Sequence, residues 1–376
     1  MQTSPPVISA IIPTYRRPEM LERAIRSVLN QTYPHLRVRV FDNASGDETA
    51  AVVAAIGRED SRVAYYCHPE NIGMSANFAY AMAHVETPYF SMLSDDDYYH
   101  PTFYETAMDG FARYPDVMLS AAATVMVHAN GSVQVGSPAE GYFTPPEGFL
   151  LWTQTRGPAV TSMVFRRDVI ERVGLIDQTI FHADIDYLWR ITARFPFVTS
   201  ARPGLIFTIH ARQSTRQADM ETPVRSYLLL RERVRATPDV SPLVRKTVDA
   251  FLRARLSRSV LYAGLAAIGK GDDRHGERAA TILRTSFDQK GRAALLGLLA
   301  RGCGYIPPVR WPARLLVRAA VHAATTLAQF ERDTRSNSAL RAEITAFTRQ
   351  VRVLSAPSGA SSRGGGPQPV RQRGGE

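Results

Sequence analysis

The first hundred residues alternate short apolar runs with segments of helical periodicity, and this alternation constrains the fold more than any other feature of the chain. The runs rich in β-branched and aromatic residues are 7–12, 36–41, 63–67 and 89–93. The segments between them with apolar residues at helical spacing are 18–30, 49–56 and 75–84. Repeated alternation of this kind predicts an α/β fold, an open sheet flanked by helices. The run 7–12 is nearly all apolar, so we expect a central strand that ends at Pro13.

Polar clusters follow three of these predicted strands. They are Pro13-Thr14-Tyr15, Asp42-Asn43 and Ser94-Asp95-Asp96-Asp97. Ligands of open α/β sheets bind beyond the carboxyl ends of the strands. We therefore expect the three clusters to converge in one cleft.

The run Asp95-Asp96-Asp97 is the most informative of these clusters. Adjacent carboxylates repel one another unless a cation offsets their charge. A hard divalent ion, Mg²⁺ or Mn²⁺, takes oxygen ligands of this kind and binds diphosphates. The alternative is a solvated acidic turn that caps the next helix.

Asp42 ends the second predicted strand and has two interpretations. Its carboxylate can accept hydrogen bonds from a nucleobase or a ribose hydroxyl, as acidic residues at strand ends do in dinucleotide folds. It can also belong to an ordinary turn, because Asn43, Ser45, Gly46 and Asp47 favour turns and helix caps. The two interpretations are compatible.

With these clusters in view, residues 6–216 resemble the family-2 glycosyltransferases. The matching segments, in the family's order, are IIPTY, the turn at 42–47, HPENIG at 68–73, the acidic run at 94–97 and GLIDQTIFHADID at 174–186. The resemblance implies a GT-A fold, a Rossmann-like open mixed sheet flanked by helices. It also implies an inverting enzyme that takes a sugar from a nucleotide-diphosphate sugar with the help of a divalent metal.

The resemblance implies roles for individual residues. Those expected to contact the nucleotide or donor sugar are Pro13, Thr14, Tyr15, Arg17, Asp42, Asn43, Asn71, Gly73, Asn77 and Asp95. Those expected to hold Mn²⁺ or Mg²⁺ are Asp96, Asp97 and His210. Many members of the family have Asp where this chain has Ser94, so the choice of metal ligand among the three carboxylates stays open.

The resemblance further implies that Asp184 is the general base that deprotonates the acceptor hydroxyl, although Ala183 replaces the usual Glu. An inverting transfer needs such a carboxylate opposite the leaving diphosphate. The alternative is an acid at a helix N-terminus, with Asp186 and Arg190 as a surface pair. Beyond His210, residues 212–216 suit a loop that covers phosphates.

Charge divides the chain in two. Residues 1–220 contain 18 basic and 23 acidic side chains, whereas residues 221–376 contain 27 and 12. We expect a catalytic domain at 1–220, a basic helical region at 221–354 and a disordered tail at 355–376 that is rich in Gly, Ser, Pro and Arg. The segment 310–322 spaces Arg310, Arg314, Arg318 and His322 four residues apart, either to contact an anionic membrane or as a solvated face.

The remaining expectations concern location and partners. No leader or membrane span is predicted, and two distant cysteines indicate a reducing compartment, so we expect a cytoplasmic protein, peripheral on the inner face of the cell membrane. The expected partners are a UDP-sugar or dTDP-sugar donor, a glycan or glycolipid acceptor and an anionic membrane surface. No nucleic acid is expected, although an inactive nucleotide-sugar-binding protein and a nucleic-acid-binding protein remain alternatives.

Overall fold

The computed structural model describes residues 5–128, 130–136, 138–154, 157–210, 221–237, 240–305 and Leu315. Its first elements are β1 (Ile8–Thr14), α1 (Pro18–Leu29), β2 (Leu36–Asp42), α2 (Thr49–Glu59), β3 (Val63–Cys67), α3 (Met74–Ala83) and β4 (Tyr89–Met92). The alternation predicted from the sequence is therefore confirmed. One expected end was wrong: β1 continues through Pro13, because Thr14 still pairs with Asp42 of β2.

The following segment adds shorter strands and helices. They are β5 (Tyr98–Tyr99), α4 (Phe103–Arg113), β6 (Leu119–His128), β7 (Val133–Val135), β8 (Gly141–Phe143), α5 (Glu147–Gln154), the 3₁₀ turn η1 (Val160–Ser162), β9 (Met163–Arg166), α6 (Asp168–Val173), α7 (Ala183–Thr192) and β10 (Phe197–Ile209). Most of the strands join one sheet in the order β3-β2-β1-β4-β9-β6-β10-β5, with β7 on β6 and β8 on β10. Strand β1 lies inside the sheet and is buried along its whole length, as expected.

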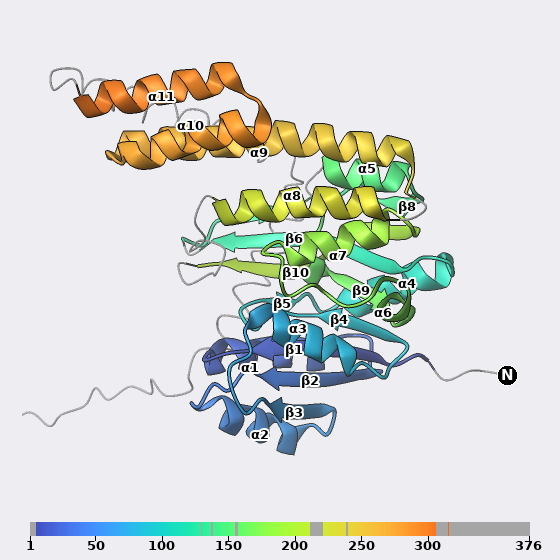
Figure 1. Ribbon diagram of the computed structural model, residues 1–376. Coiled ribbons are helices and arrows are strands. Elements are labelled where there is room, and N and C mark those ends of the chain that lie inside the picture. Colours follow the sequence, from blue (N-terminus) through green and yellow to red (C-terminus); the bar gives the residue numbers. More distant parts are fainter. Residues whose placement is uncertain are drawn as a thin grey trace, which may run out of the picture.

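The sheet is mixed. Strand β1 runs parallel to β2 and β4, and β2 runs parallel to β3. Strand β9 is antiparallel to both β4 and β6, whereas β10 is parallel to β6 and antiparallel to β5. Helices α1, α2 and α4 cover one face, and α3, α6 and α7 cover the other (Figure 1). The predicted open mixed sheet flanked by helices is confirmed.

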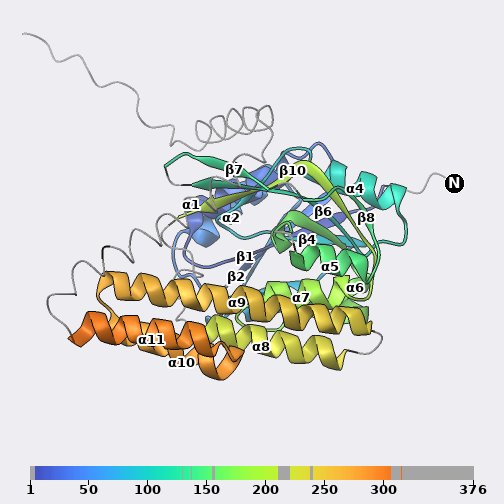
Figure 2. The same cartoon turned by 90° about the horizontal axis from the view of Figure 1, so that it is seen from above.

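Four helices follow the sheet: α8 (Glu221–Ala236), α9 (Pro242–Lys270), α10 (Asp273–Phe287) and α11 (Lys290–Tyr305). The side chain of Ser241 caps α9 by accepting a hydrogen bond from the backbone N–H of Val244. Gly271 ends the helix in the left-handed conformation at φ 95°, which glycine adopts without strain. Helix α8 packs on α7 and α9 packs on α5, while α10 and α11 pack on α9 in an outer layer (Figure 2), which confirms the helical appendage predicted after the sheet.

The outer layer shares one hydrophobic core with the sheet region. Phe149 of α5 and Trp189 of α7 pack in the same buried cluster as Leu230 of α8, Val260 of α9 and Leu296 of α11. The division at residue 220 is not tested by this contact and stays a prediction. The expected loop at 212–216, the basic segment 310–322 and the tail 355–376 lie outside the described residues, apart from Leu315. Among the helices that the structure describes, none combines the length and the apolar composition needed to cross a bilayer.

Candidate functional site

The three polar clusters meet at the carboxyl ends of β1, β2 and β4. The Thr14 hydroxyl donates to Asp95 Oδ2 at 2.9 Å, which joins the end of β1 to the acidic turn. The backbone N–H of Arg16 donates to Ser45 Oγ at 2.8 Å, which joins β1 to the loop after β2. Arg16 reaches this position with a left-handed backbone at φ 54°. The predicted convergence of the clusters is therefore observed.

Arg17 connects two of the carboxylates. Its Nη1 lies 2.9 Å from Asp95 Oδ1 and 2.8 Å from Asp96 Oδ2. The other oxygen of Asp95 accepts from Thr14 and from the backbone N–H of Tyr15, so both oxygens of this buried carboxylate have protein partners. Burial raises the pKa of Asp95, and the Arg17 cation opposes this effect. Asp95 thus holds the end of β1 and Arg17 in place, beside the surface where a donor is expected.

Asp96 pairs with His210. Its Oδ2 lies 3.0 Å from His210 Nε2, which comes directly after β10. This pair supplies one carboxylate oxygen and one imidazole nitrogen. In the part of the chain that the structure describes, no group of three or more His, Cys, Asp and Glu side chains is arranged around an ion site. Mg²⁺ and Mn²⁺ often take one or two protein ligands and complete their coordination with substrate phosphates and water, so the pair fits such an ion.

Asp97 points away from this pair. It is only 1% exposed, and its Oδ1 accepts a hydrogen bond from the backbone N–H of Thr208 at 2.8 Å. Burial raises the pKa of its carboxyl group, and the neighbouring charge of Asp96 adds to this effect. This hydrogen bond places Asp97 against β10, whereas Asp96 contacts Arg17 and His210.

Asp42 shapes the loop that follows β2. Its Oδ1 accepts from the backbone N–H of Ser45 at 3.1 Å, and its Oδ2 accepts from the Tyr65 hydroxyl at 2.7 Å. The turn interpretation of Asp42 is thus observed. Tyr15 lies nearby with 37% of its surface exposed and can offer its ring to a base, whereas Pro13 and Thr14 are buried behind it.

The predicted amide residues form two separate networks. Asn43 Nδ2 donates to Asn71 Oδ1 at 2.9 Å, and the same oxygen accepts from the backbone N–H of Gly73 at 2.9 Å. This network holds the exposed segment 71–73 next to the end of β2. Asn77 is buried instead: its Nδ2 donates to the Phe41 carbonyl at 2.8 Å, and its Oδ1 lies 3.0 Å from His68 Nε2. Asn77 therefore attaches α3 to β2 where we expected a donor contact.

Asp184 lies in the first turn of α7, as its sequence context predicts. The side chain reaches solvent, yet the protein around it displaces enough water to raise the pKa of its carboxyl group. Backbone N–H groups of Asp184 and Ile185 oppose that shift by hydrogen bonding to the carboxylate. A carboxylate that is accessible but partly desolvated has the properties of a general base.

The alternative interpretation of this segment made Asp186 and Arg190 a surface pair, but Asp186 is buried. Only 2% of it is exposed, and its Oδ2 lies 2.8 Å from Arg190 Nε and 3.4 Å from Arg233 Nη1 of α8. The helix turns this side chain inward because residues 184 and 186 lie on different faces of α7. Asp186 thus joins α7 to α8.

Sequence reasoning missed Arg23 and Thr208. Arg23 Nη2 donates to the Asp96 carbonyl oxygen at 2.6 Å and lies 3.3 Å from Thr208 Oγ1. For Arg23, the one available signal was its position in α1 between Leu21 and Ala24, two residues that face the core. Thr208 gave no signal, because its role depends on a turn more than a hundred residues earlier in the chain.

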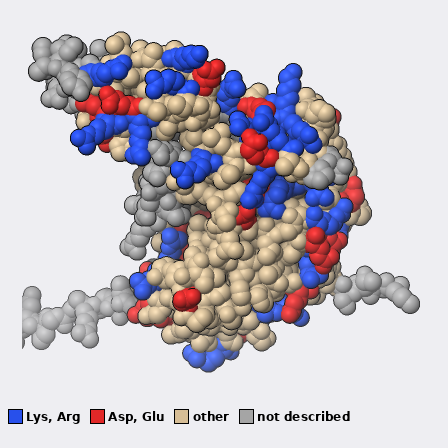
Figure 3. Space-filling model, viewed as in Figure 1, with Lys and Arg blue, Asp and Glu red and all other residues tan. Residues whose placement is uncertain are grey.

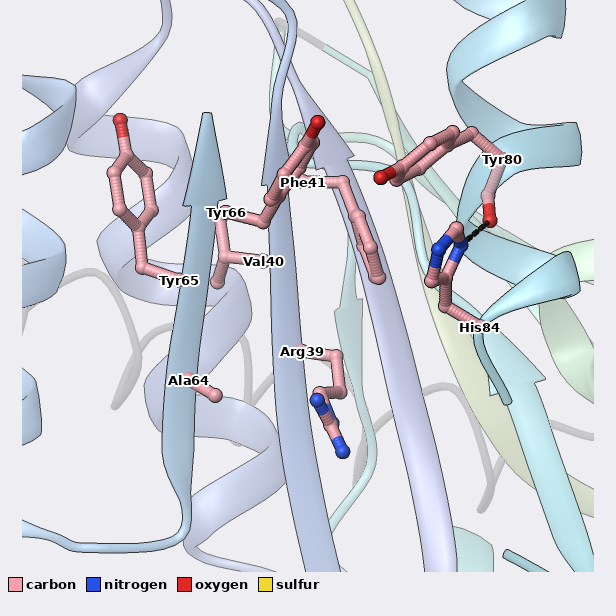
Figure 4. Close-up of a pocket in the computed structure, with 8 residues that line it drawn as sticks. All are labelled: Arg39, Val40, Phe41, Ala64, Tyr65, Tyr66, Tyr80 and His84. Atoms are coloured by element: carbon pink, nitrogen blue, oxygen red, sulfur yellow. Dashed lines mark hydrogen bonds between the residues drawn. The ribbon is translucent and has the colours of Figure 1, made fainter. Parts of the chain in front are cut away.

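A shallow groove of about 120 Å³ lies elsewhere, on the α3 side of β2 and β3 (Figure 4). The rings of Tyr66 and Tyr80 stack with centroids 5.1 Å apart, and the rings of Tyr80 and His84 stack at 4.1 Å. None of the predicted site residues lines this groove. It is therefore separate from the carboxylate cluster.

Comparisons with known proteins agree with this geometry. Residues 9–174 match the model of the family described as Glycosyl transferase family 2. The chain is 33% identical over 225 residues, 57% of its length, to the uncharacterized glycosyltransferase RT0329 of Rickettsia typhi, and covers 68% of that protein. It is 32% identical over 93 residues, 24% of its length, to the GalNAc(5)-diNAcBac-PP-undecaprenol beta-1,3-glucosyltransferase of Campylobacter jejuni, of which it covers 30%.

Solved structures share the fold. Residues 1–349 of TarS from S. aureus, in complex with UDP-GlcNAc, match with a TM-score of 0.58 and 14% identity, over 79% of this chain and 91% of that one. The mannosyltransferase PcManGT from Pyrobaculum calidifontis, in complex with GDP-Man and Mn²⁺, matches with a TM-score of 0.53 and 16% identity, over 85% and 87%. With its mixed sheet and polar strand ends, the chain belongs to glycosyl transferase family 2 and is a glycosyltransferase of GT-A fold.

Proposed function

We propose that this enzyme transfers a sugar, with inversion, from a nucleotide-diphosphate sugar to a hydroxyl group of a glycan or glycolipid acceptor, and that a divalent metal assists the transfer. The observation that carries the proposal is the Asp96–His210 pair beside Arg17, at the strand ends where α/β sheets bind nucleotides. Inactive and nucleic-acid-binding alternatives have no such observation in their favour.

The donor would lie over the ends of β1 and β2. The exposed ring of Tyr15 offers a stacking surface for the base, and the network of Asn43, Asn71 and Gly73 borders the same side. Arg17 offers a cation for the diphosphate, because guanidinium groups bind phosphate oxygens in a bidentate manner. On this proposal Arg17 exchanges its carboxylate partners for phosphate when the donor binds.

Asp96 and His210 would hold Mn²⁺ or Mg²⁺. A bound ion of this kind neutralises charge on the diphosphate as it leaves. PcManGT was solved with Mn²⁺, and the donor set here, a carboxylate with an imidazole, is compatible with that metal. Asp184 would accept the proton of the attacking acceptor hydroxyl, and its raised pKa makes the carboxylate a better proton acceptor than an ordinary aspartate.

The helical region supports a lipid-linked acceptor and a peripheral position on the inner face of the cell membrane. Helix α11 contains Lys290, Arg292 and Arg301 and no acidic residue, and it exposes 55% of Leu295 and 65% of Leu298. Figure 3 shows Lys and Arg side chains gathered over the helical region at the top of the view. Exposed leucines flanked by cations suit the surface of an anionic bilayer.

A nucleotide screen tests the donor proposal. UDP, dTDP, GDP and CDP would each be added with and without Mn²⁺ while the melting temperature is measured, because a ligand stabilises the folded state by mass action. We expect one nucleotide to raise the melting temperature in a metal-dependent manner. A salt-sensitive shift with nucleic acid, and none with any nucleotide, would favour the nucleic-acid-binding alternative.

Sedimentation with vesicles tests the membrane proposal. The full chain should bind vesicles that contain phosphatidylglycerol more strongly than vesicles of phosphatidylcholine, and Leu298→Glu should weaken that binding. Leu243→Glu is the matched control, because Leu243 is 51% exposed on α9 rather than α11. Equal vesicle binding by both variants would contradict a membrane role for α11. A Leu298→Glu variant that still binds vesicles but no longer self-associates would contradict it too.

A further inference from the structure

Asp97 is buried in a place where the mechanism above gives it no task. Its Oδ1 accepts the hydrogen bond from the Thr208 backbone, and its Oδ2 has no hydrogen-bonding partner among the described residues. Its own backbone N–H closes the acidic turn by donating to the Ser94 carbonyl at 3.1 Å. Burying a carboxylate costs free energy, and the contacts of Asp97 must offset that cost.

The ladder of strand pairs explains why Thr208 needs this partner. Strand β5 pairs with β10 at Tyr98–Ile206 and Tyr99–Leu205, and the pairing ends there. Two residues further along β10, the N–H of Thr208 meets the Asp97 side chain instead of a strand. Buried backbone N–H groups require an acceptor, and Asp97 supplies one where β5 stops.

Arg23 connects the same two segments from the other side. It reaches from α1 to the backbone carbonyl of Asp96 and to the hydroxyl of Thr208, at 2.6 and 3.3 Å. Its guanidinium carbon lies 4.7 Å from the centroid of the Tyr98 ring. Two side chains thus join the acidic turn to the end of β10: Asp97, from the turn itself, and Arg23, from α1.

Thr208 is two residues from His210, whose imidazole contacts the Asp96 carboxylate at 3.0 Å. The contacts therefore form a closed circuit. The Asp96 carboxylate contacts His210, the chain leads from His210 back to Thr208, and Asp97 and Arg23 connect Thr208 to the acidic turn and the backbone of Asp96. We propose that Asp97 and Arg23 are positioning residues, which fix the separation of the Asp96 carboxylate and the His210 imidazole and thereby set metal affinity. Asp97 acts through its hydrogen bond and does not ligate the ion.

This inference rests on the proposed metal role of Asp96 and His210, and two substitutions at one position test it. Asp97→Asn keeps an oxygen that can accept from the Thr208 N–H, whereas Asp97→Ala removes it. Mn²⁺ binding to the full-length protein would be followed by electron paramagnetic resonance, with and without the nucleotide that stabilises the wild type. We expect Asp97→Ala to weaken Mn²⁺ binding roughly 10-fold, the effect of one hydrogen bond to a charged group, and Asp97→Asn to stay near the wild type.

The outcomes separate the two roles. If Asp97 were a ligand, its amide would bind Mn²⁺ poorly, so equal losses in Asp97→Asn and Asp97→Ala would overturn the inference. Wild-type protein that binds no Mn²⁺ would instead overturn the proposed metal site itself. If Asp97→Ala does not fold, Arg23→Gln provides the second measurement: it should weaken Mn²⁺ binding with Asp96 and His210 intact, and unchanged binding would contradict the circuit.

Discussion

The Asp184→Asn substitution tests the proposed chemistry most directly. It keeps the size of the side chain and its place in the first turn of α7 but removes the group that would accept the proton. General base catalysis contributes about 100- to 10,000-fold to a rate, so kcat should fall by that factor, about 3 to 5 kcal/mol of activation free energy. Metal-dependent donor binding should be unchanged, because Asp184 belongs to α7, whereas the pairs of Asp96 with Arg17 and His210 join the acidic turn to the ends of β1 and β10.

The assay follows sugar transfer and nucleotide affinity in the same preparation. Asp168→Asn is the matched control, because Asp168 is an exposed acid in the first turn of α6 and its loss changes the net charge equally. The control should keep wild-type turnover. If Asp184→Asn retains wild-type kcat, Asp184 is not the base. If the variant loses donor affinity together with turnover, the substitution has changed the structure of the site, and this result also contradicts the assignment.

Four further predictions concern pH, metal binding and packing. Because the pKa of Asp184 is raised, transfer should fall as the pH drops through a value above that of an ordinary aspartate, and a pH–rate profile without this acidic limb would contradict the assignment. The same shift makes the ionised carboxylate unfavourable in the folded state above that pKa, so Asp184→Asn should melt no lower than the wild type at pH 8. Asp96→Ala should abolish the Mn²⁺-dependent part of nucleotide binding; retained metal dependence, measured by calorimetry, would remove Asp96 from the site. Asp186→Ala leaves the Arg190 cation without its carboxylate partner, while Arg233 keeps Asp177, so chemical denaturation should show a loss of roughly 3 kcal/mol, whereas a loss below about 1 kcal/mol would show that solvent replaces the pair.

The sequence predicted the elements around the site better than the directions of their side chains. Apolar runs and helical spacing are local properties, so β1 to β4 and their helices could be located from neighbouring residues alone. These local patterns could not show that Asp97 and Asp96 have different partners. Its direction depends on the backbone of Thr208, 111 residues later in the chain, and on the point where β5 ends.

Similar reasons explain the other differences. Asn77 was expected at the donor from the family resemblance, but its amide donates to the Phe41 carbonyl beneath α3. The alternative interpretation of Asp184 placed Asp186 and Arg190 on the surface as an i,i+4 pair, and only the packing of α8 shows that this face is covered. In both cases a polar side chain pairs with a group from another element, the Phe41 carbonyl or an arginine of α8, and the local sequence does not reveal that partner.

The core shared by α5, α7 and the outer helices limits how the enzyme can be divided. An expression fragment that stopped at residue 220 would leave Phe149 and Trp189 in water, and it would uncover the outer side of the helix that carries Asp184. Such a fragment should aggregate even though all of the residues assigned to the donor are present. An exchange of acceptor-binding regions between relatives would for the same reason have to transfer the facing surfaces of α5 and α7 together with the helices that pack on them.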